Sequence, residues 1–196
     1  MSESERQAWD ERYRTGTYQP RPKAGPFLES WMPRLPVGRT LDVACGAGRN
    51  AFRLAEAGHR VTAVDVSSVA VDMARAEADQ RSLEIDWMVS DLDEYAVPES
   101  SFDLITVIRY VNRGLWPRLI EGLVPDGWLL IEHHLQTDAD VDGPSSPDFR
   151  LRPQELLEAF AELRIVFYEE TLEPGDQDGR PFALARLVAC RGDPGF

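Results

Sequence analysis

Short apolar segments alternate with amphipathic segments along most of the chain, and polar stretches separate them. Runs of aliphatic and β-branched residues have the length of strands, whereas apolar residues three and four positions apart are typical of helices. Strands are predicted at 40–43, 61–65, 85–89, 102–108, 128–132, 165–170 and 182–190. Helices are predicted at 5–14, 26–32, 48–57, from Ser67 or Ser68 onward, and at 153–161. This alternation predicts an α/β fold with a doubly wound, mostly parallel sheet.

Single residues mark the ends of several predicted elements. Gly16 and Gly58 each follow a helical pattern, where a residue of positive φ commonly ends a helix. In the first helix, Trp9 and Tyr13 are four positions apart and therefore share a face. A Gly- and Asp-rich loop is predicted at 173–180, before the last strand. We expect one domain over 1–196, with a helical cover at 1–33 and the sheet core at 39–196.

The composition suits a globular domain, with 196 residues of which 43% are hydrophobic. The formal net charge of −13 argues against a nucleic-acid partner, because binding to phosphates requires a basic face. The two cysteines form no disulfide framework, the polar start does not resemble a signal peptide, and no apolar run is long enough to cross a bilayer. We expect a cytoplasmic monomer or homodimer with no membrane partner.

The segment 40–50 carries the clearest chemical signal. An apolar strand leads to Asp42 and then to Ala44, Cys45, Gly46 and Gly48, before a helix begins. Small residues allow a ligand to approach the backbone, and the helix that follows presents free N–H groups. The next strand ends in Asp65, and an acid roughly 20 residues after such a loop is placed to bind the hydroxyls of a ribose. These features predict a nucleoside cofactor.

The details of the loop discriminate between cofactors. A dinucleotide fingerprint needs a third glycine, which this loop lacks. Asp42 would repel a pyrophosphate but attract an ammonium group, which S-adenosylmethionine carries. The loop therefore favours S-adenosylmethionine, and a nicotinamide-dependent oxidoreductase is the less favoured alternative.

The block 42–50 resembles the glycine-rich motif of class I S-adenosylmethionine-dependent methyltransferases, with Ala44 and Asn50 in place of its outer glycines. Ser90-Asp91-Leu92 is similar to the motif that binds adenine in that family, and 123–130 is similar to its turn into the fifth strand. The resemblance implies a seven-stranded sheet of order 3-2-1-4-5-7-6 with strand 7 antiparallel. It also implies S-adenosyl-L-methionine as the methyl donor and S-adenosyl-L-homocysteine as the product.

The same resemblance gives a set of residues expected to bind the cofactor. They are Asp42, Ala44, Cys45, Gly46, Asn50, Asp65, Val66, Asp91, Leu92, Ile108 and Arg109. The aromatic residues Trp9, Tyr13, Tyr18 and Trp31 are expected to form a cover that keeps water from the sulfonium.

Four segments resemble one branch of the family. Gly46–Asn50 followed by Gly58–Val61, together with 149–156 and 166–170, is similar to the tellurite-resistance methyltransferases. Those enzymes methylate soft acceptors, so the resemblance implies a small-molecule acceptor such as a thiol or a chalcogen anion.

The candidate catalytic residues follow the fourth and fifth strands, because ligands bind beyond the carboxyl ends of such strands. His133 or His134 can act as a general base, although a soft nucleophile needs none. Arg109 and Arg113 can hold an anionic acceptor or the cofactor carboxylate, and Arg180 aligns with a family segment near the acceptor. No metal site is expected, since adjacent histidines on a strand point to opposite faces and no third ligand is evident.

A non-catalytic S-adenosylmethionine-binding sensor or regulatory module remains an alternative. Its binding loops would have the same sequence pattern, and no indispensable catalytic residue is identifiable in the chain. A turnover assay separates the two.

Overall fold

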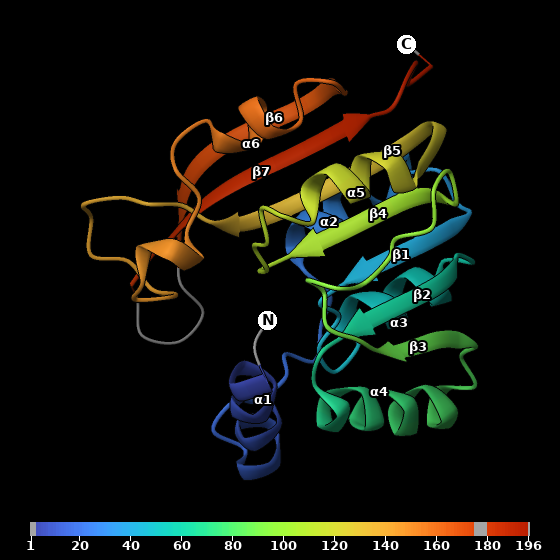
Figure 1. Cartoon of the computed structure of the whole chain (residues 1–196), viewed down its shortest axis with the longest axis vertical. Helices are drawn as coiled ribbons and strands as arrows, with labels where there is room; N and C mark the ends of the chain where they lie inside the picture. The colour runs from blue at the N-terminus through green and yellow to red at the C-terminus, as the bar shows by residue number, and fades with distance from the viewer. Residues whose placement is uncertain (1–2, 175–179, 196) are drawn as a thin grey trace.

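The computed structural model describes residues 3–174 and 180–195, so most of the loop predicted at 173–180 lies outside the described residues. The strands of its sheet are β1 (Arg39–Val43), β2 (Arg60–Asp65), β3 (Ile85–Val89), β4 (Phe102–Ile108), β5 (Leu123–His134), β6 (Arg164–Glu173) and β7 (Phe182–Cys190). Their order is β3-β2-β1-β4-β5-β7-β6, and β7 is antiparallel to both of its neighbours (Figure 1). The predicted seven-stranded α/β fold and its strand order are confirmed.

Most of the helices lie where the amphipathic pattern predicts them. They are α1 (Glu3–Thr15), α2 (Pro26–Trp31), η1 (Met32–Arg34), α3 (Arg49–Glu56), α4 (Ser68–Arg81), α5 (Trp116–Gly122), η2 (Pro147–Phe149) and α6 (Glu155–Ala159). The short α5 was not predicted from its pattern, and α6 is shorter than the predicted 153–161. Ser67 is the N-cap of α4 as expected, and its Oγ accepts a hydrogen bond of 3.1 Å from the Ala70 N–H.

β5 is longer than its apolar pattern indicates. It begins at Leu123 rather than at 128, because the predicted turn is a left-handed kink within the strand, with φ of +63° at Asp126. At the other end, pairing with β7 extends β5 through His133 and His134. The two histidines therefore lie in the strand and not beyond it.

The sheet buries both faces, as a doubly wound fold requires. Along β5, Leu129 and Ile131 face a core shared with α5 and α6, whereas Trp128 and Leu130 face a core shared with α2 and α3. This alternation follows from the two-residue period of a strand. A parallel sheet covered on both sides leaves the carboxyl ends of its strands as the place for a ligand.

The N-terminal helix α1 lies beside α4, on the side to which the parallel strands point (Figure 1). Asp10 attaches it there, because its carboxylate accepts hydrogen bonds from the Ser67 hydroxyl at 2.7 Å and from the Val69 N–H at 3.2 Å. Asp10 thus joins α1 to the first turn of α4.

Among the described residues, no helix has both the length and the apolar character that crossing a membrane requires.

Candidate functional site

A pocket of about 360 Å³ lies at the carboxyl ends of β1, β2 and β4. It is lined by Trp9, Tyr13, Tyr18, Pro20, Arg21, Ala44, Cys45, Gly46, Ala47, Arg49, Asn50, Asp65, Val66, Ile108, Arg109, Tyr110, His134 and Pro144. Most of the residues predicted from the family resemblance to bind a cofactor are in this set. A larger hollow of about 1080 Å³, near the amino ends of β2 and β3, is lined by none of them.

The glycine loop lines the pocket, and two of its positions accept only glycine because of their backbone conformation and close neighbours. Gly46 and Gly48 have φ of +54° and +85°. A Cβ at Gly46 would lie 2.7 Å from the Tyr13 hydroxyl oxygen, and one at Gly48 would lie 2.6 Å from the Trp87 ring. Any side chain at either position would therefore strain the backbone and collide with a neighbour.

Asp65 is held firmly at the end of β2. One carboxylate oxygen accepts the Gly46 N–H at 2.8 Å and the other accepts the Ser67 N–H at 2.9 Å. Burial nevertheless raises the pKa of this carboxyl above its usual value. Each oxygen keeps a lone pair, so the carboxylate can accept hydrogen bonds from two ribose hydroxyls.

Asp42 does not line the pocket but lies fully buried in β1. Its Oδ1 accepts a hydrogen bond of 2.8 Å from the Thr106 hydroxyl, while Oδ2 has no hydrogen-bond partner among the described residues. Burial raises the pKa of Asp42 to about 7. An unsatisfied buried oxygen is costly, and a cationic ligand or a bridging water would satisfy it. This oxygen, the glycine loop and Asp65 together fit a nucleoside with an ammonium group.

The structure does not bring Asp91 and Leu92 into the pocket lining. The Asp91 carboxylate accepts the Asp93 N–H at 2.8 Å, and Leu92 is fully buried in the core. Their contact with an adenine ring therefore stays a prediction from the resemblance.

The aromatic cover forms from three of the four predicted residues. Trp9, Tyr13 and Tyr18 pack on one another with ring centroids 5.3 to 6.1 Å apart, and all three line the pocket. The prediction for Trp31 is wrong, because its ring packs on Phe167 in the core at 5.5 Å.

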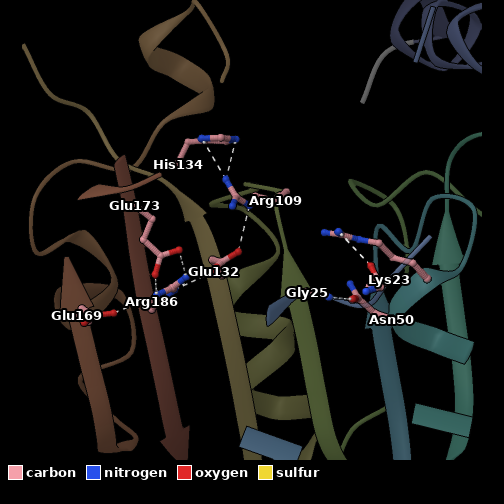
Figure 2. Close-up of polar contacts among 10 residues, drawn as sticks. Lys23, Gly25, Asn50, Arg109, Glu132, His134, Glu169, Glu173 and Arg186 are labelled. Carbon is pink, nitrogen blue, oxygen red and sulfur yellow. Dashed lines mark hydrogen bonds and ion pairs between the residues drawn. The ribbon is translucent and has the colours of Figure 1, made fainter. Parts of the chain in front are cut away.

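The first turn of α3 contacts the backbone of the segment that follows α1, at residues 23–25. The Asn50 side-chain oxygen accepts the Gly25 N–H at 2.9 Å, and the Arg49 guanidinium lies 3.5 Å from the Lys23 carbonyl oxygen (Figure 2). Asn50 stands where the family motif has a glycine. The hydrogen bond from the Gly25 N–H to its side-chain oxygen joins the N-terminal segment to the end of the glycine-rich block.

Arg109 forms part of the opposite wall, at the end of β4. Its Nε donates to Glu132 Oε1 at 3.1 Å, and its Nη1 lies 3.2 Å from Nε2 of His134 (Figure 2). The side chain is 21% exposed, and it lines the pocket.

Neither histidine is placed to act as a base. His134 lines the pocket, but its ring faces the Arg109 guanidinium, and burial together with that cation lowers its pKa to about 2. His133 lies outside the pocket lining with its Nε2 2.8 Å from the Phe149 carbonyl oxygen, and burial lowers its pKa to about 4. Both imidazoles are neutral at pH 7 and too weakly basic for efficient proton transfer.

Two predicted arginines lie outside the pocket lining. Arg113 forms an ion pair of 2.5 Å with the buried Glu155, and its Nη2 donates to the Arg150 carbonyl oxygen. Arg180 is exposed, and it lies 3.6 Å from Asp142. Both arginines are engaged in ion pairs away from the pocket.

The pattern of the sequence missed Arg21, Arg49 and Tyr110 in the pocket lining, and Glu132 beneath it. Arg21 lies between Pro20 and Pro22, after α1, and Arg49 directly follows Gly48 of the glycine loop. Their nearness in sequence to predicted site residues is the only signal that could have indicated them. Burial and mutual repulsion lower the pKa values of Arg49 and Arg109. The pocket thus gathers guanidinium groups in a chain whose net charge is −13.

Comparisons with known proteins agree with this geometry. Residues 40–124 match the family described as a methyltransferase domain. The chain is 30% identical to Hemagglutinin 1 of Eikenella corrodens over 167 residues, which are 80% of this chain and 55% of that protein. It is 36% identical to the ubiquinone biosynthesis O-methyltransferase of Xanthomonas campestris over 79 residues, which are 40% of this chain and 33% of that enzyme. The chain thus spans between about a third and about half of the length of these relatives.

The structure of TehB from Haemophilus influenzae superposes with a TM-score of 0.74 at 22% identity, covering 93% of this chain and 67% of that one. At this identity the likeness shows the fold alone.

The segment that matches the methyltransferase domain covers residues 40–124, and the whole chain has the strand order that the resemblance to class I S-adenosylmethionine-dependent methyltransferases implies. The match supports S-adenosylmethionine as the cofactor, and it favours the methyltransferase interpretation over the oxidoreductase alternative.

Proposed function

We propose that the protein transfers the methyl group of S-adenosylmethionine to a small anionic acceptor, such as a thiolate or a chalcogen anion. The observation that carries the proposal is the group of guanidinium side chains, Arg21, Arg49 and Arg109, on the walls of the pocket. The relatives named above carry other names and activities, so they do not define the acceptor.

The chain's own residues divide the work of binding the cofactor. Asp65 would accept the ribose hydroxyls, the glycine loop would allow the ligand to approach the backbone, and the orphan oxygen of Asp42 would receive the ammonium group. Trp9, Tyr13 and Tyr18 would exclude water from the site. The bound cofactor supplies a sulfonium methyl group, and displacement by the acceptor anion forms the new bond to carbon while the C–S electron pair returns to sulfur.

The charges of the pocket favour an anionic acceptor. S-adenosylmethionine carries two positive groups and one carboxylate, so its bound form is a cation. One guanidinium can pair with that carboxylate. The remaining guanidinium groups would oppose a second cation, and in a partly buried site such repulsion is larger than in water. An anion relieves it.

The absence of a suitable base in the described pocket lining points to the same class of acceptor. His134 is neutral and faces Arg109, and burial raises the pKa of Tyr110 to about 12, so its hydroxyl stays protonated. A nucleophile that is ionised in solution needs no proton transfer in the pocket. The protein then contributes alignment and desolvation.

A screen of acceptors with an isotopically labelled methyl donor tests the proposal. It compares selenite, tellurite and small thiolates with neutral phenols and amines. We expect transfer to anions, and a loss of that transfer in Arg109→Met with little change in the affinity for S-adenosylhomocysteine. Transfer only to neutral acceptors would contradict the proposal, whereas tight cofactor binding without transfer to any acceptor would support the binding-module alternative.

We also propose that the protein acts in the cytoplasm on small molecules, as a monomer or homodimer. Cys45 and Cys190 are free thiols, which suits a reducing compartment.

A further inference from the structure

Arg109 is fixed by one neighbour through both its backbone and its side chain. Its φ is +65°, a left-handed conformation that is unfavourable for a residue with a side chain. The Arg109 N–H donates to the Glu132 carbonyl oxygen at 2.8 Å, and its Nε donates to Glu132 Oε1 at 3.1 Å. Glu132 therefore determines where the guanidinium lies at the pocket wall.

Glu132 is itself oriented from the side away from the pocket. Its side chain is 2% exposed, and its second oxygen, Oε2, accepts a hydrogen bond of 2.7 Å from Arg186 Nε. The two oxygens of the carboxylate thus serve two different arginines. A buried carboxylate needs such partners, because desolvation would otherwise destabilise it.

Arg186 is held in turn by carboxylates of the edge strand. It lies on β7 directly between Glu132 of β5 and Glu169 of β6 in the register of the sheet. Its Nη1 and Nη2 lie 2.5 and 2.7 Å from the two oxygens of Glu173, and Nη1 is also 3.2 Å from Glu169 (Figure 2). Its Nη1 and Nη2 thus contact the edge strand β6, its Nε contacts Glu132, and Arg186 is not part of the pocket lining.

We propose that Arg186 is a positioning residue, which holds Oε2 of Glu132 so that Arg109 receives only Oε1. Arg109 then keeps Nη2 for the anionic acceptor, while its Nη1 lies against His134. Carboxylates and guanidinium groups readily form bidentate pairs. Without Arg186, both oxygens of Glu132 would be available to Arg109, and that pairing would draw the guanidinium away from the pocket. This inference rests on the proposed anionic acceptor.

The test measures how 4-nitrothiophenolate, a coloured thiolate, binds to the protein saturated with S-adenosylhomocysteine. The variants are Arg109→Met, Arg186→Met, Arg186→Lys and the double variant Arg109→Met with Arg186→Met. We expect Arg109→Met and Arg186→Met each to weaken binding by about 10-fold or more. Arg186→Lys should weaken it as well, since a single ammonium cannot donate to Glu132 and Glu173 in the same geometry.

The double variant separates positioning from a direct effect of charge. If Arg186 acts through Arg109, the double variant binds the probe no more weakly than Arg109→Met alone. Additive losses, or wild-type affinity in Arg186→Lys, would overturn the inference and indicate that only the charge of Arg186 matters.

A second readout needs no acceptor. The exchange rate of the Arg109 Nε proton, followed by nuclear magnetic resonance in the ligand-free protein, reports directly on its hydrogen bond to Glu132. We expect a changed rate in both Arg186 variants, and an unchanged rate would overturn the inference even if the probe does not bind. If Arg109→Met leaves probe binding unchanged, the anionic-acceptor proposal fails instead.

Glu155→Gln is the matched control for folding. It disrupts the ion pair of another buried carboxylate, with the exposed side chain of Arg113, outside the pocket lining. It should lower the melting temperature without changing probe affinity. If Glu155→Gln weakens probe binding as much as Arg186→Met does, the effect of Arg186 is one of general stability and the inference is wrong.

Discussion

At the scale of single residues, Asp65 gives the most direct test of the cofactor site. Asp65→Ala removes both acceptors for the ribose hydroxyls and also leaves the Gly46 and Ser67 N–H groups without their partner. Each lost hydrogen bond to a buried ligand costs about 1–3 kcal/mol. We expect the affinity for S-adenosylhomocysteine, measured by calorimetry, to fall about 5- to 150-fold for each ribose hydrogen bond that is lost.

Asp86→Ala is the control, because this exposed carboxylate of β3 is not in the pocket lining. Unchanged affinity in Asp65→Ala would remove the ribose assignment. Asp91→Ala tests the adenine prediction separately, and a loss of affinity there would mean that the loop after β3 closes on the ligand.

The histidines make the second prediction at this scale. If the acceptor is already ionised, His134→Gln and His133→Gln should lower kcat far less than the roughly 100- to 10,000-fold expected for loss of a general base. The rate should rise with pH according to the pKa of the acceptor and not that of an imidazole. A loss above about 100-fold, with cofactor affinity intact, would show base catalysis and point to a hydroxyl or amine acceptor.

Asp42 couples cofactor binding to pH. Burial raises the pKa of this carboxyl in the folded protein to about 7, above its ordinary value, so the folded state keeps a proton that the unfolded state loses. Its contribution to stability therefore falls as pH rises from about 4 to about 7 and is constant above that range.

An ammonium group placed beside Asp42 would lower this pKa and expel the proton. We expect S-adenosylhomocysteine binding near pH 6.5 to release a proton, detected by calorimetry in buffers of different ionisation enthalpy. Asp42→Asn should abolish the release. Binding that releases no proton in the native protein would contradict the placement of the ammonium group.

At the scale of elements, we expect α1 to cover the cofactor site only while it is attached to α4. The Asp10 carboxylate joins the two helices, because it accepts hydrogen bonds from the Ser67 hydroxyl and the Val69 N–H. Asp10→Ala removes this acceptor. We expect faster limited proteolysis at residues 12–23 and weaker binding of S-adenosylhomocysteine. In the native protein the same ligand should slow this cleavage.

Glu11→Ala is the control for α1, because Glu11 is the exposed neighbour of Asp10 and its carboxylate pairs only within the helix, with Arg14. Equal cleavage rates with and without ligand in the native protein would show that α1 does not close over the cofactor.

The elements also show what the sequence could and could not predict. The family resemblance predicted the strand order correctly. Local spacing predicted the glycine loop and Asp65, and both contribute to the pocket lining. The position of the two histidines was predicted wrongly, beyond the fifth strand, because the extent of β5 depends on its pairing with β7 and not on its own pattern. Arg21 and the Glu132–Arg186 pair depend on contacts between distant segments, which hydrophobic periodicity does not encode.

At the scale of the whole molecule, two opposing fields act on an anionic acceptor. The chain carries a net charge of −13, which repels an anion at long range, whereas Arg21, Arg49 and Arg109 attract it at contact distance. Salt affects these two terms differently. The screening length falls from about 30 Å at 0.01 M salt to about 8 Å at 0.15 M, so the repulsion of the distant surface is screened while contacts of about 3 Å are preserved.

We therefore expect 4-nitrothiophenolate to bind the S-adenosylhomocysteine complex a few times more tightly at about 0.15 M than at about 0.01 M potassium fluoride, a salt whose anion is strongly hydrated. Equilibrium dialysis at constant pH measures this directly. In Arg109→Met, absolute affinity should be lower but the rise with salt should remain, because the distant surface charge is nearly the same. A steady fall of affinity with salt in the native protein would mean that the arginines, and not the acidic surface, dominate the field that an approaching anion meets.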